Sequence, residues 1–135
     1  MRLLEGKDVP ENGYFIPLTL VDNPPEDSRV VQEEAFGPVL PLIRFTDVDD
    51  VIARANASPY GLAGSVWSAD LDAAQAVAER LDTGTVWINE AQHVAPWLPF
   101  GGHKQSGIGI ENGTEGLLEY TNAQTITVRK PAVAA

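Results

Sequence analysis

Between residues 39 and 89 the chain alternates short apolar runs with amphipathic segments, and this alternation limits the possible folds more than any other feature. Three mostly apolar runs have the length of β-strands: 39–45, 62–68 and 85–89. The segments between them repeat apolar residues with helical spacing, for example at Val48, Val51, Ile52 and Ala55. The order strand, helix, strand, helix, strand predicts two right-handed βαβ units, and therefore a βαβαβ parallel sheet in an α/β fold.

Residues with capping preferences mark the ends of both expected helices. The first helix is expected within 46–58, with Thr46 or Asp47 at its N-cap. The second is expected over 70–81, and Gly84 is placed to form its C-terminal turn. Each helix would connect two of the expected strands.

The pattern changes on either side of this region. Residues 13–21 look extended, although Pro17 suits an edge strand or a break. A long glycine-rich and aromatic segment, 90–113, follows the last apolar run, where ligands of open α/β sheets bind, and we expect an ordered loop there. A short helix, an alternating strand and a frayed tail are expected to close the chain, at 114–121, 123–130 and 131–135.

Charge, cysteine content and hydropathy argue against several classes of protein. The formal net charge is −10, and the nine lysines and arginines form no patch along the sequence, which argues against a nucleic-acid partner. The chain has no cysteine, so it contains no disulfide, thiolate metal site or thiol nucleophile. No apolar run approaches the roughly 20 residues that span a bilayer, and the N-terminus has no apolar signal-peptide region. We therefore expect a soluble, cytoplasmic protein without a membrane or nucleic-acid partner.

Two motifs that suggest ligand binding are better explained by structure. The glycines of 107–113 have the spacing G-x-G-x-x-x-G and follow a loop, so they do not match a dinucleotide-binding fingerprint. His93 and His103 are ten residues apart and have no cysteine partners, so no metal site is expected. We expect glycines that serve backbone conformation and histidines that make loop hydrogen bonds.

Two adjacent acids, Glu33 and Glu34, precede an aromatic residue and a Gly-Pro break in the sequence EEAFGP. Such a pair can be solvated surface, half of an acid/base machinery, or a clamp on a sugar. Taken alone, these acids are best explained as solvated residues before a buried strand, with Phe36 in the core.

Four stretches in order change that interpretation: GYFIPLTL, EEAFGPVLP, YGLAGSVWSADL with GTVWIN, and PFGGHKQSGIG, followed by EYTNAQTITV. Together, from about Gly13 to Arg129, they resemble the C-terminal part of the aldehyde dehydrogenase superfamily. The combination of E-x-F-G-P with a later P-F-G-G-x-K-x-S-G is the most specific part of the match. The resemblance implies that residues 1–121 form the later part of a catalytic domain and 122–135 an oligomerisation strand and tail.

The resemblance assigns roles to five residues. It implies that Glu34 binds the hydroxyls of the nicotinamide-side ribose of NAD or NADP, and that Phe36 lies against the nicotinamide. An ionised carboxylate only accepts hydrogen bonds and a ribose diol donates two, which fits this role. It also implies that Phe100, Trp97 and Val94 line the aldehyde-binding funnel.

Other residues receive structural roles from the same resemblance: Asn89 holds the loop, and Lys104 and Ser106 belong to the signature. The family's reaction needs a cysteine thiolate and a glutamate base, which the family carries upstream of the matched region, so no catalytic residue is assigned here. Met1 lies just before that region, so we expect either a separate truncated gene product or an expressed fragment.

Two hypotheses for the function follow. The chain is the C-terminal segment of an NAD(P)-dependent enzyme that oxidises aldehydes to carboxylic acids, inactive alone. Alternatively, it is an assembly module that pairs through its terminal strand with a second copy or another aldehyde dehydrogenase chain.

Overall fold

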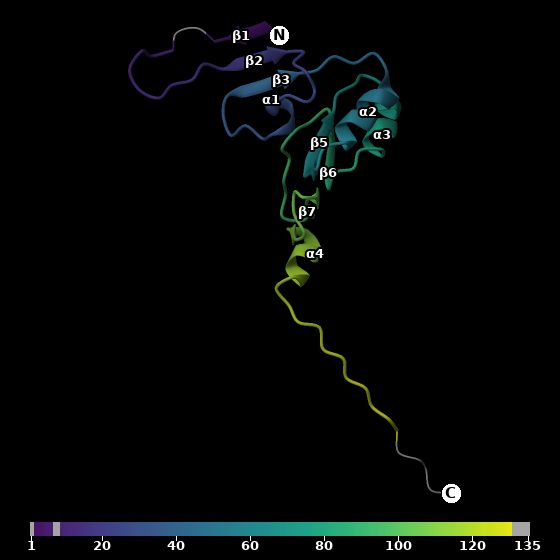
Figure 1. The fold of residues 1–135 in the computed structure, drawn as a ribbon. Helices are drawn as coiled ribbons and strands as arrows, with labels where there is room; N and C mark the ends of the chain where they lie inside the picture. Colours follow the sequence, from purple (N-terminus) through teal and green to yellow (C-terminus); the bar gives the residue numbers. More distant parts are fainter. Residues whose placement is uncertain (1, 7–8, 131–135) are drawn as a thin grey trace, which may run out of the picture. The chain divides into compact units, whose positions relative to one another are not determined.

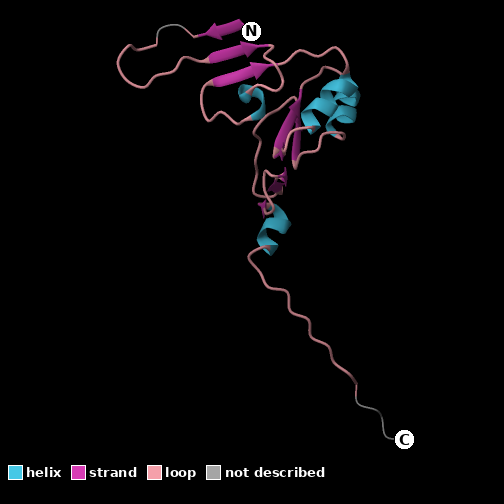
Figure 2. Cartoon of the chain, viewed as in Figure 1, coloured by secondary structure: helices cyan, strands magenta, loops and turns pink. Residues whose placement is uncertain are grey.

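A computed structural model describes residues 2–6 and 9–130, which form an α/β fold with mixed parallel and antiparallel pairing (Figures 1 and 2). The chain divides into two units, Met1–Ser58 and Pro59–Ala135, here called unit 1 and unit 2. No helix within the described residues has the length and apolar character needed to cross a bilayer.

Unit 1 contains a three-stranded sheet in the order β1, β2, β3. The strands are β1 (Arg2–Glu5), β2 (Thr19–Asp22) and β3 (Val39–Leu42). β1 and β2 are antiparallel, whereas β2 and β3 are parallel. The crossover between β2 and β3 carries the short helix α1 (Arg29–Gln32), which contacts β3, and helix α2 (Val48–Asn56) follows β3.

Unit 2 is built around a β5–α3–β6 unit. β5 (Ala63–Val66) and β6 (Thr85–Ile88) pair in parallel from Ala63↔Thr85 to Val66↔Ile88, and α3 (Leu71–Ala78) contacts both strands. Two short antiparallel pairs follow: β4 (Tyr60–Gly61) with β8 (His103–Lys104), and β7 (Phe100–Gly101) with β9 (Ile110–Glu111). Helix α4 (Gly113–Leu118) is the last regular element that the structure describes.

Both predicted helices begin at aspartate N-caps. The Asp47 side chain accepts a hydrogen bond from Asp50 N (2.9 Å), and the Asp70 side chain accepts one from Ala73 N (3.0 Å). Each bond satisfies a backbone donor that has no partner within the helix. Of the two candidates for the first helix, Asp47 is therefore the N-cap residue.

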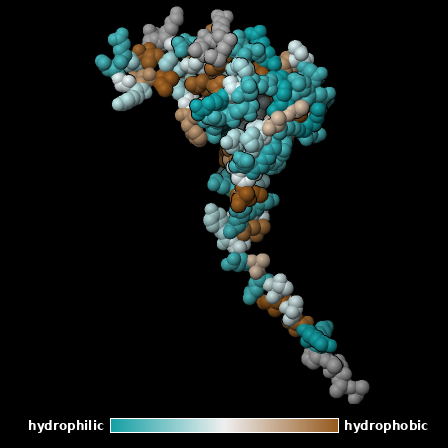
Figure 3. Space-filling view, in the orientation of Figure 1, coloured by the Kyte–Doolittle hydropathy of each residue, from teal (hydrophilic) through white to brown (hydrophobic). Residues whose placement is uncertain are grey.

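The buried apolar core of the described residues is small. Val21 and Ile52 are buried in unit 1, and Ala74 and Ala95 are buried in unit 2. Many larger apolar side chains are exposed, and Figure 3 shows hydrophobic atoms on the surface of unit 1 and along the segment after α4. Much apolar surface of the described residues therefore stays in contact with solvent.

The predicted single βαβαβ sheet is not confirmed. β3 pairs with β2 in unit 1, as shown by the bonds from Thr19 N to Pro38 O (2.8 Å) and from Asn23 N to Leu42 O (2.7 Å), whereas β5 pairs with β6 in unit 2. The chain leaving α2 first forms β4, which pairs with β8. Only the second predicted βαβ unit, β5–α3–β6, has its two strands in one parallel pair.

The strand expected at 123–130 is not found among the described residues. Residues 122–130 are exposed and form neither helix nor strand. An alternating sequence forms a strand only where a second strand satisfies its backbone groups. The predicted tail, 131–135, lies outside the described residues. The division into domains at 121 and 122 stays a prediction.

Gly84 has a different role from the one its position suggested. Helix α3 ends at Ala78, well before Gly84. A Cβ on Gly84 would lie 1.7 Å from the carbonyl oxygen of Gly101, so only glycine allows the backbone entering β6 to pass this close to β7. The residue brings together two segments that flank the long loop.

Candidate functional site

The loop that follows β6 begins at Asn89, which ties the ends of β5 and β6 together. Asn89 N donates to Val66 O (2.8 Å). Its side-chain amide pairs with the backbone of Ser68 in both directions, from Ser68 N to Oδ1 and from Nδ2 to Ser68 O, each at 2.8 Å. Its φ of 54° is left-handed, a conformation that asparagine tolerates better than most residues. The predicted loop-holding role of Asn89 fits this geometry.

Three hydrogen bonds and one buried side chain order the loop beyond Asn89. The indole Nε1 of Trp87 donates to His93 O (3.0 Å), and Leu98 N closes a turn onto Ala95 O (3.0 Å). Ala95 is buried, and Gly113 N donates to Pro96 O (2.9 Å). The expectation of an ordered loop agrees with these contacts.

Three side chains of this segment were expected to line an aldehyde funnel. Val94 and Trp97 are exposed, with 74% of Trp97 accessible, and Phe100 is half-buried at the start of β7. An indole held by an ordered backbone and left open to solvent offers apolar contact area to a ligand or partner. The structure thus brings Val94, Trp97 and Phe100 onto one fixed segment of unit 2.

The glycine-rich signature after Phe100 makes structural contacts. The Ser106 hydroxyl accepts a hydrogen bond from Gly61 N (2.9 Å), and Gln105 N donates to Pro59 O (3.0 Å). Lys104 Nζ lies 3.1 Å from Asp82 Oδ2. These contacts agree with the structural roles expected for Lys104 and Ser106.

Asp82 is a shared acceptor for two residues of β8. In addition to the contact with Lys104, Asp82 Oδ1 lies 3.1 Å from His103 Nδ1. The hydrogen bond from Lys104, and then that from His103, hold the pKa of Asp82 below its usual value of 3.8. His93 likewise lies 3.1 Å from a carboxylate, that of Glu90. Both histidines thus lie beside carboxylates, His93 in the loop after β6 and His103 in β8, and no group of three or more potential metal ligands lies among the described residues.

The acid pair of unit 1 separates into two different environments. Arg29 Nε and Nη2 donate to both carboxylate oxygens of Glu33, at 2.8 Å each, and this bonding lowers the pKa of Glu33. Glu34, beyond the end of α1, is exposed and makes no side-chain hydrogen bond or ion pair among the described residues. Glu34 is therefore the member of the pair that is open to a ligand.

Phe36 was first expected in the core, and this was wrong. Its side chain is 96% exposed in the loop between α1 and β3. Its ring is therefore open to solvent, and its contact with a nicotinamide stays a prediction. The five candidate residues thus fall into two sets: Glu34 and Phe36 in unit 1, and Val94, Trp97 and Phe100 in unit 2.

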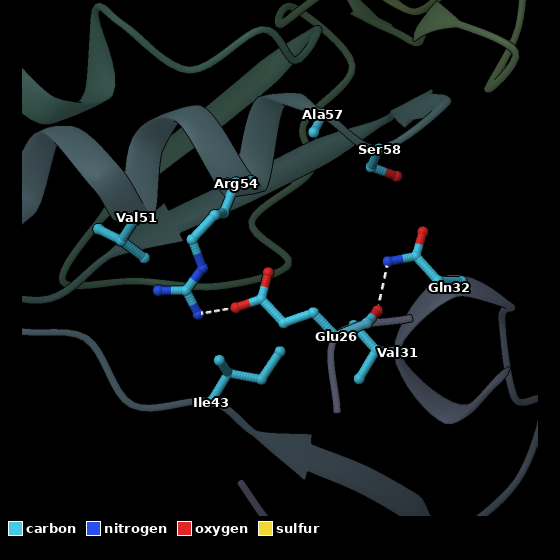
Figure 4. A pocket seen from close by; sticks show the side chains of 9 residues that line it. Glu26, Val31, Gln32, Ile43, Val51, Arg54, Ala57 and Ser58 are labelled. Carbon is cyan, nitrogen blue, oxygen red and sulfur yellow. Dashed lines mark hydrogen bonds and ion pairs between the residues drawn. The ribbon is translucent and has the colours of Figure 1, made fainter. Parts of the chain in front are cut away.

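Sequence reasoning missed a cavity of about 330 Å³ in unit 1 (Figure 4). Its apolar wall includes Val31, Ile43 and Val51. At its rim, Arg54 pairs with Glu26 and with Asp50 (3.0 Å), and the two carboxylates raise the pKa of Arg54. No sequence signal indicates this cavity, because its walls come from three separate segments.

Comparison with known proteins finds one family whose members match most of this chain. The model of the "Aldehyde dehydrogenase family" matches residues 1–126. A succinate-semialdehyde dehydrogenase [NADP(+)] of Deinococcus radiodurans is 48% identical over 138 residues, covering 98% of this chain and 29% of the relative.

Two solved structures have the same fold. An aldehyde dehydrogenase of Mycobacterium tuberculosis complexed with NAD+ gives a TM-score of 0.82 at 44% identity, over 90% of this chain and 26% of that one. A betaine aldehyde dehydrogenase of Staphylococcus aureus, in complex with NAD+, gives 0.80 at 45% identity, over 87% and 24%. The chain spans about a quarter of the length of these proteins.

Proposed function

The chain belongs to the aldehyde dehydrogenase family, and we propose that it is the C-terminal segment of an NAD(P)-dependent enzyme that oxidises aldehydes to carboxylic acids. The observation that carries this proposal is the exposed E-x-F-G-P loop of unit 1, where the Glu34 carboxylate makes no hydrogen bond or ion pair with the described residues and the Phe36 ring is exposed. The NAD+ present in two similar solved structures supports the choice of cofactor class.

Glu34 would hold the nicotinamide-side ribose of NAD or NADP. An ionised carboxylate accepts hydrogen bonds from the two hydroxyls of a ribose diol, and each charge-assisted bond contributes about 1.5–3 kcal/mol. Phe36 would pack against the nicotinamide ring and restrict its tilt, which favours the geometry of hydride transfer. Glu33 has no part in this, because its two carboxylate oxygens bind Arg29.

Val94, Trp97 and Phe100 would form one wall of the aldehyde site. The hydrogen bonds at Asn89, Trp87 and Gly113 hold the backbone that carries them. Held side chains cost less conformational entropy on binding, and this favours a defined wall over a flexible one.

The nucleophile would come from outside this chain, which has no cysteine. In the proposed reaction a thiolate adds to the aldehyde carbon, and the resulting thiohemiacetal gives a hydride to the nicotinamide. Water activated by a base then hydrolyses the thioester, releasing the acid. Among the acids of unit 2, Glu90 is paired with His93, and none is assigned the role of base.

Two assays test this function. The isolated chain, mixed with an aldehyde and NAD+ or NADP+, is expected to form no reduced cofactor. A chimaera that carries this chain in place of the matching segment of the Deinococcus radiodurans relative is expected to oxidise succinate semialdehyde. Rapid turnover by the isolated chain, or a folded chimaera without turnover, would refute the proposal.

A second function, as an assembly module, is favoured by the segment after α4. Residues 122–130 alternate in polarity and are exposed, including the apolar side chains of Ile126 and Val128. Such a segment is suited to pair with a strand of a second copy or of another aldehyde dehydrogenase chain. Sedimentation that shows only monomer, alone and mixed with a full-length relative, would exclude this function.

A further inference from the structure

The tripeptide Glu-Asn-Gly occurs twice in this chain, at 11–13 and at 111–113. An asparagine followed by glycine is chemically labile, because the backbone nitrogen of the glycine can attack the side-chain amide carbon and close a five-membered ring. Glycine has no Cβ to hinder this attack. The other asparagines precede proline, alanine or glutamate. The two copies therefore share their local reactivity, and the structure around each copy decides whether it reacts.

The first copy lies in the loop that joins β1 to β2 (Figure 1). Asn12 and Gly13 are exposed, and so is every residue from 10 to 16. Gly13 N donates no hydrogen bond to the described residues, and the Asn12 side-chain amide makes none with them. Within the described part of the chain, neither the attacking nitrogen nor the amide that it would attack has a competing partner.

The second copy is held at the start of helix α4. Asn112 is the N-cap residue of α4, and its carbonyl oxygen accepts a hydrogen bond from Gly116 N (3.0 Å). Gly113 N donates to Pro96 O (2.9 Å), in the loop after β6. Both Asn112 and Gly113 are half-buried. Attack by this nitrogen therefore requires the hydrogen bond to Pro96 to break and the first turn of α4 to open.

We propose that Asn12 is a site of spontaneous deamidation and isoaspartate formation, and that folding protects Asn112 from the same reaction. Gly13 N gives its proton to hydroxide and attacks Asn12 Cγ. The N–Cγ bond forms, the Cγ–Nδ2 bond breaks, and Nδ2 takes a proton from water and leaves as ammonia. A second water opens the cyclic imide at either carbonyl, which gives aspartate or isoaspartate at position 12. The net change replaces one NH2 by one OH, and the reaction needs only water and hydroxide.

Both products alter the connection between β1 and β2. Each adds one negative charge to a chain whose formal net charge is already −10. Isoaspartate also routes the main chain through the former side chain, which lengthens the loop by a methylene group. The bond from Gly6 N to Leu18 O (2.9 Å) closes this loop beside the two strands. The inference does not depend on the proposed function, because neither β1 nor β2 carries a candidate cofactor or aldehyde residue.

Mass spectrometry of the full chain tests the proposal. The folded protein is incubated at neutral pH, and samples taken at intervals are digested with trypsin, which places the two copies in different peptides, 8–29 and 105–129. Fragment ions locate the exchange of NH2 for OH, and they distinguish isoaspartate from aspartate. The same chain unfolded in guanidinium chloride is the matched control, because it keeps both tripeptides and removes the structure around them.

In the folded chain, Asn12 should deamidate at least about fivefold faster than Asn112. This ratio corresponds to about 1 kcal/mol, the usual net contribution of one hydrogen bond such as that from Gly113 N. In guanidinium chloride the two rates should agree within about twofold, because that hydrogen bond is lost. Asn12→Gln should remove the fast reaction, because attack on the longer side chain needs a six-membered ring, and should leave the rate at Asn112 unchanged.

Three results would overturn the proposal. The first is equal rates at the two positions in the folded chain. The second is a folded chain in which Asn12 stays intact while both copies react after unfolding. The third is a rate ratio that stays the same in guanidinium chloride, because the difference would then come from the flanking sequence. Isoaspartate at position 12 of the folded chain, together with a ratio that falls toward one on unfolding, would confirm it.

Discussion

Replacing Asn89 by alanine should release the loop that carries Val94, Trp97 and Phe100. The substitution removes two side-chain hydrogen bonds of 2.8 Å to Ser68. At about 0.5–1.5 kcal/mol for each bond, this costs about 1–3 kcal/mol. Alanine must also adopt the left-handed φ of 54°, which adds about 1 kcal/mol. The local cost is therefore about 2–4 kcal/mol.

The indole N–H of Trp87 reports this change directly, because it donates to His93 O inside the same loop. If the loop opens as one unit, a loss of about 2–4 kcal/mol accelerates hydrogen exchange at Trp87 Nε1 by a factor of about 30 to 1,000. The amides of α2, in the other unit, serve as the internal control.

Two further variants separate the two causes. Asn89→Gly loses the same hydrogen bonds but takes up a positive φ without strain, so its exchange should be about fivefold slower than that of Asn89→Ala. Asn89→Asp keeps the acceptor for Ser68 N and loses only the donor to Ser68 O. Exchange at Trp87 within twofold of the parent chain in Asn89→Ala would show that this pair does not hold the loop.

Three other predictions concern separate parts of the chain. Gly84→Ala should lower the free energy of unfolding by more than about 2 kcal/mol, because the new Cβ would lie 1.7 Å from Gly101 O. Urea denaturation measures this change, and Gly37→Ala is the control, because a Cβ at Gly37 meets open space. Asp82 has a lowered pKa in the folded chain, so the unfolded chain binds its proton first. The stability that Asp82 contributes is present above pH 3.8 and is lost as the pH falls below it, and Asp82→Asn should remove this part of the pH dependence in thermal unfolding. In the chimaera, Glu34→Gln should slow hydride transfer about tenfold or more in single-turnover kinetics, whereas Glu33→Gln should not, because Glu33 binds Arg29.

Local signals in the sequence predicted the elements that depend on neighbouring residues. Asp47 and Asp70 cap the helices that follow them, as their side-chain chemistry indicated. β5, α3 and β6 are adjacent in sequence and in space, so a short-range pattern was enough to predict their parallel pairing. The loop-holding role of Asn89 came instead from the family resemblance, and its hydrogen bonds to Ser68 agree with that role.

Pairing between distant segments could not be read from the same patterns. The apolar run at β3 does not reveal that its neighbour is β2, because this pairing rests on hydrogen bonds between segments about 20 residues apart in the sequence. The run at 123–130 has the composition of a strand but no partner strand among the described residues. Phe36 was placed in the core because aromatic residues are usually buried, yet it is exposed, and the role proposed for it rests on the family resemblance.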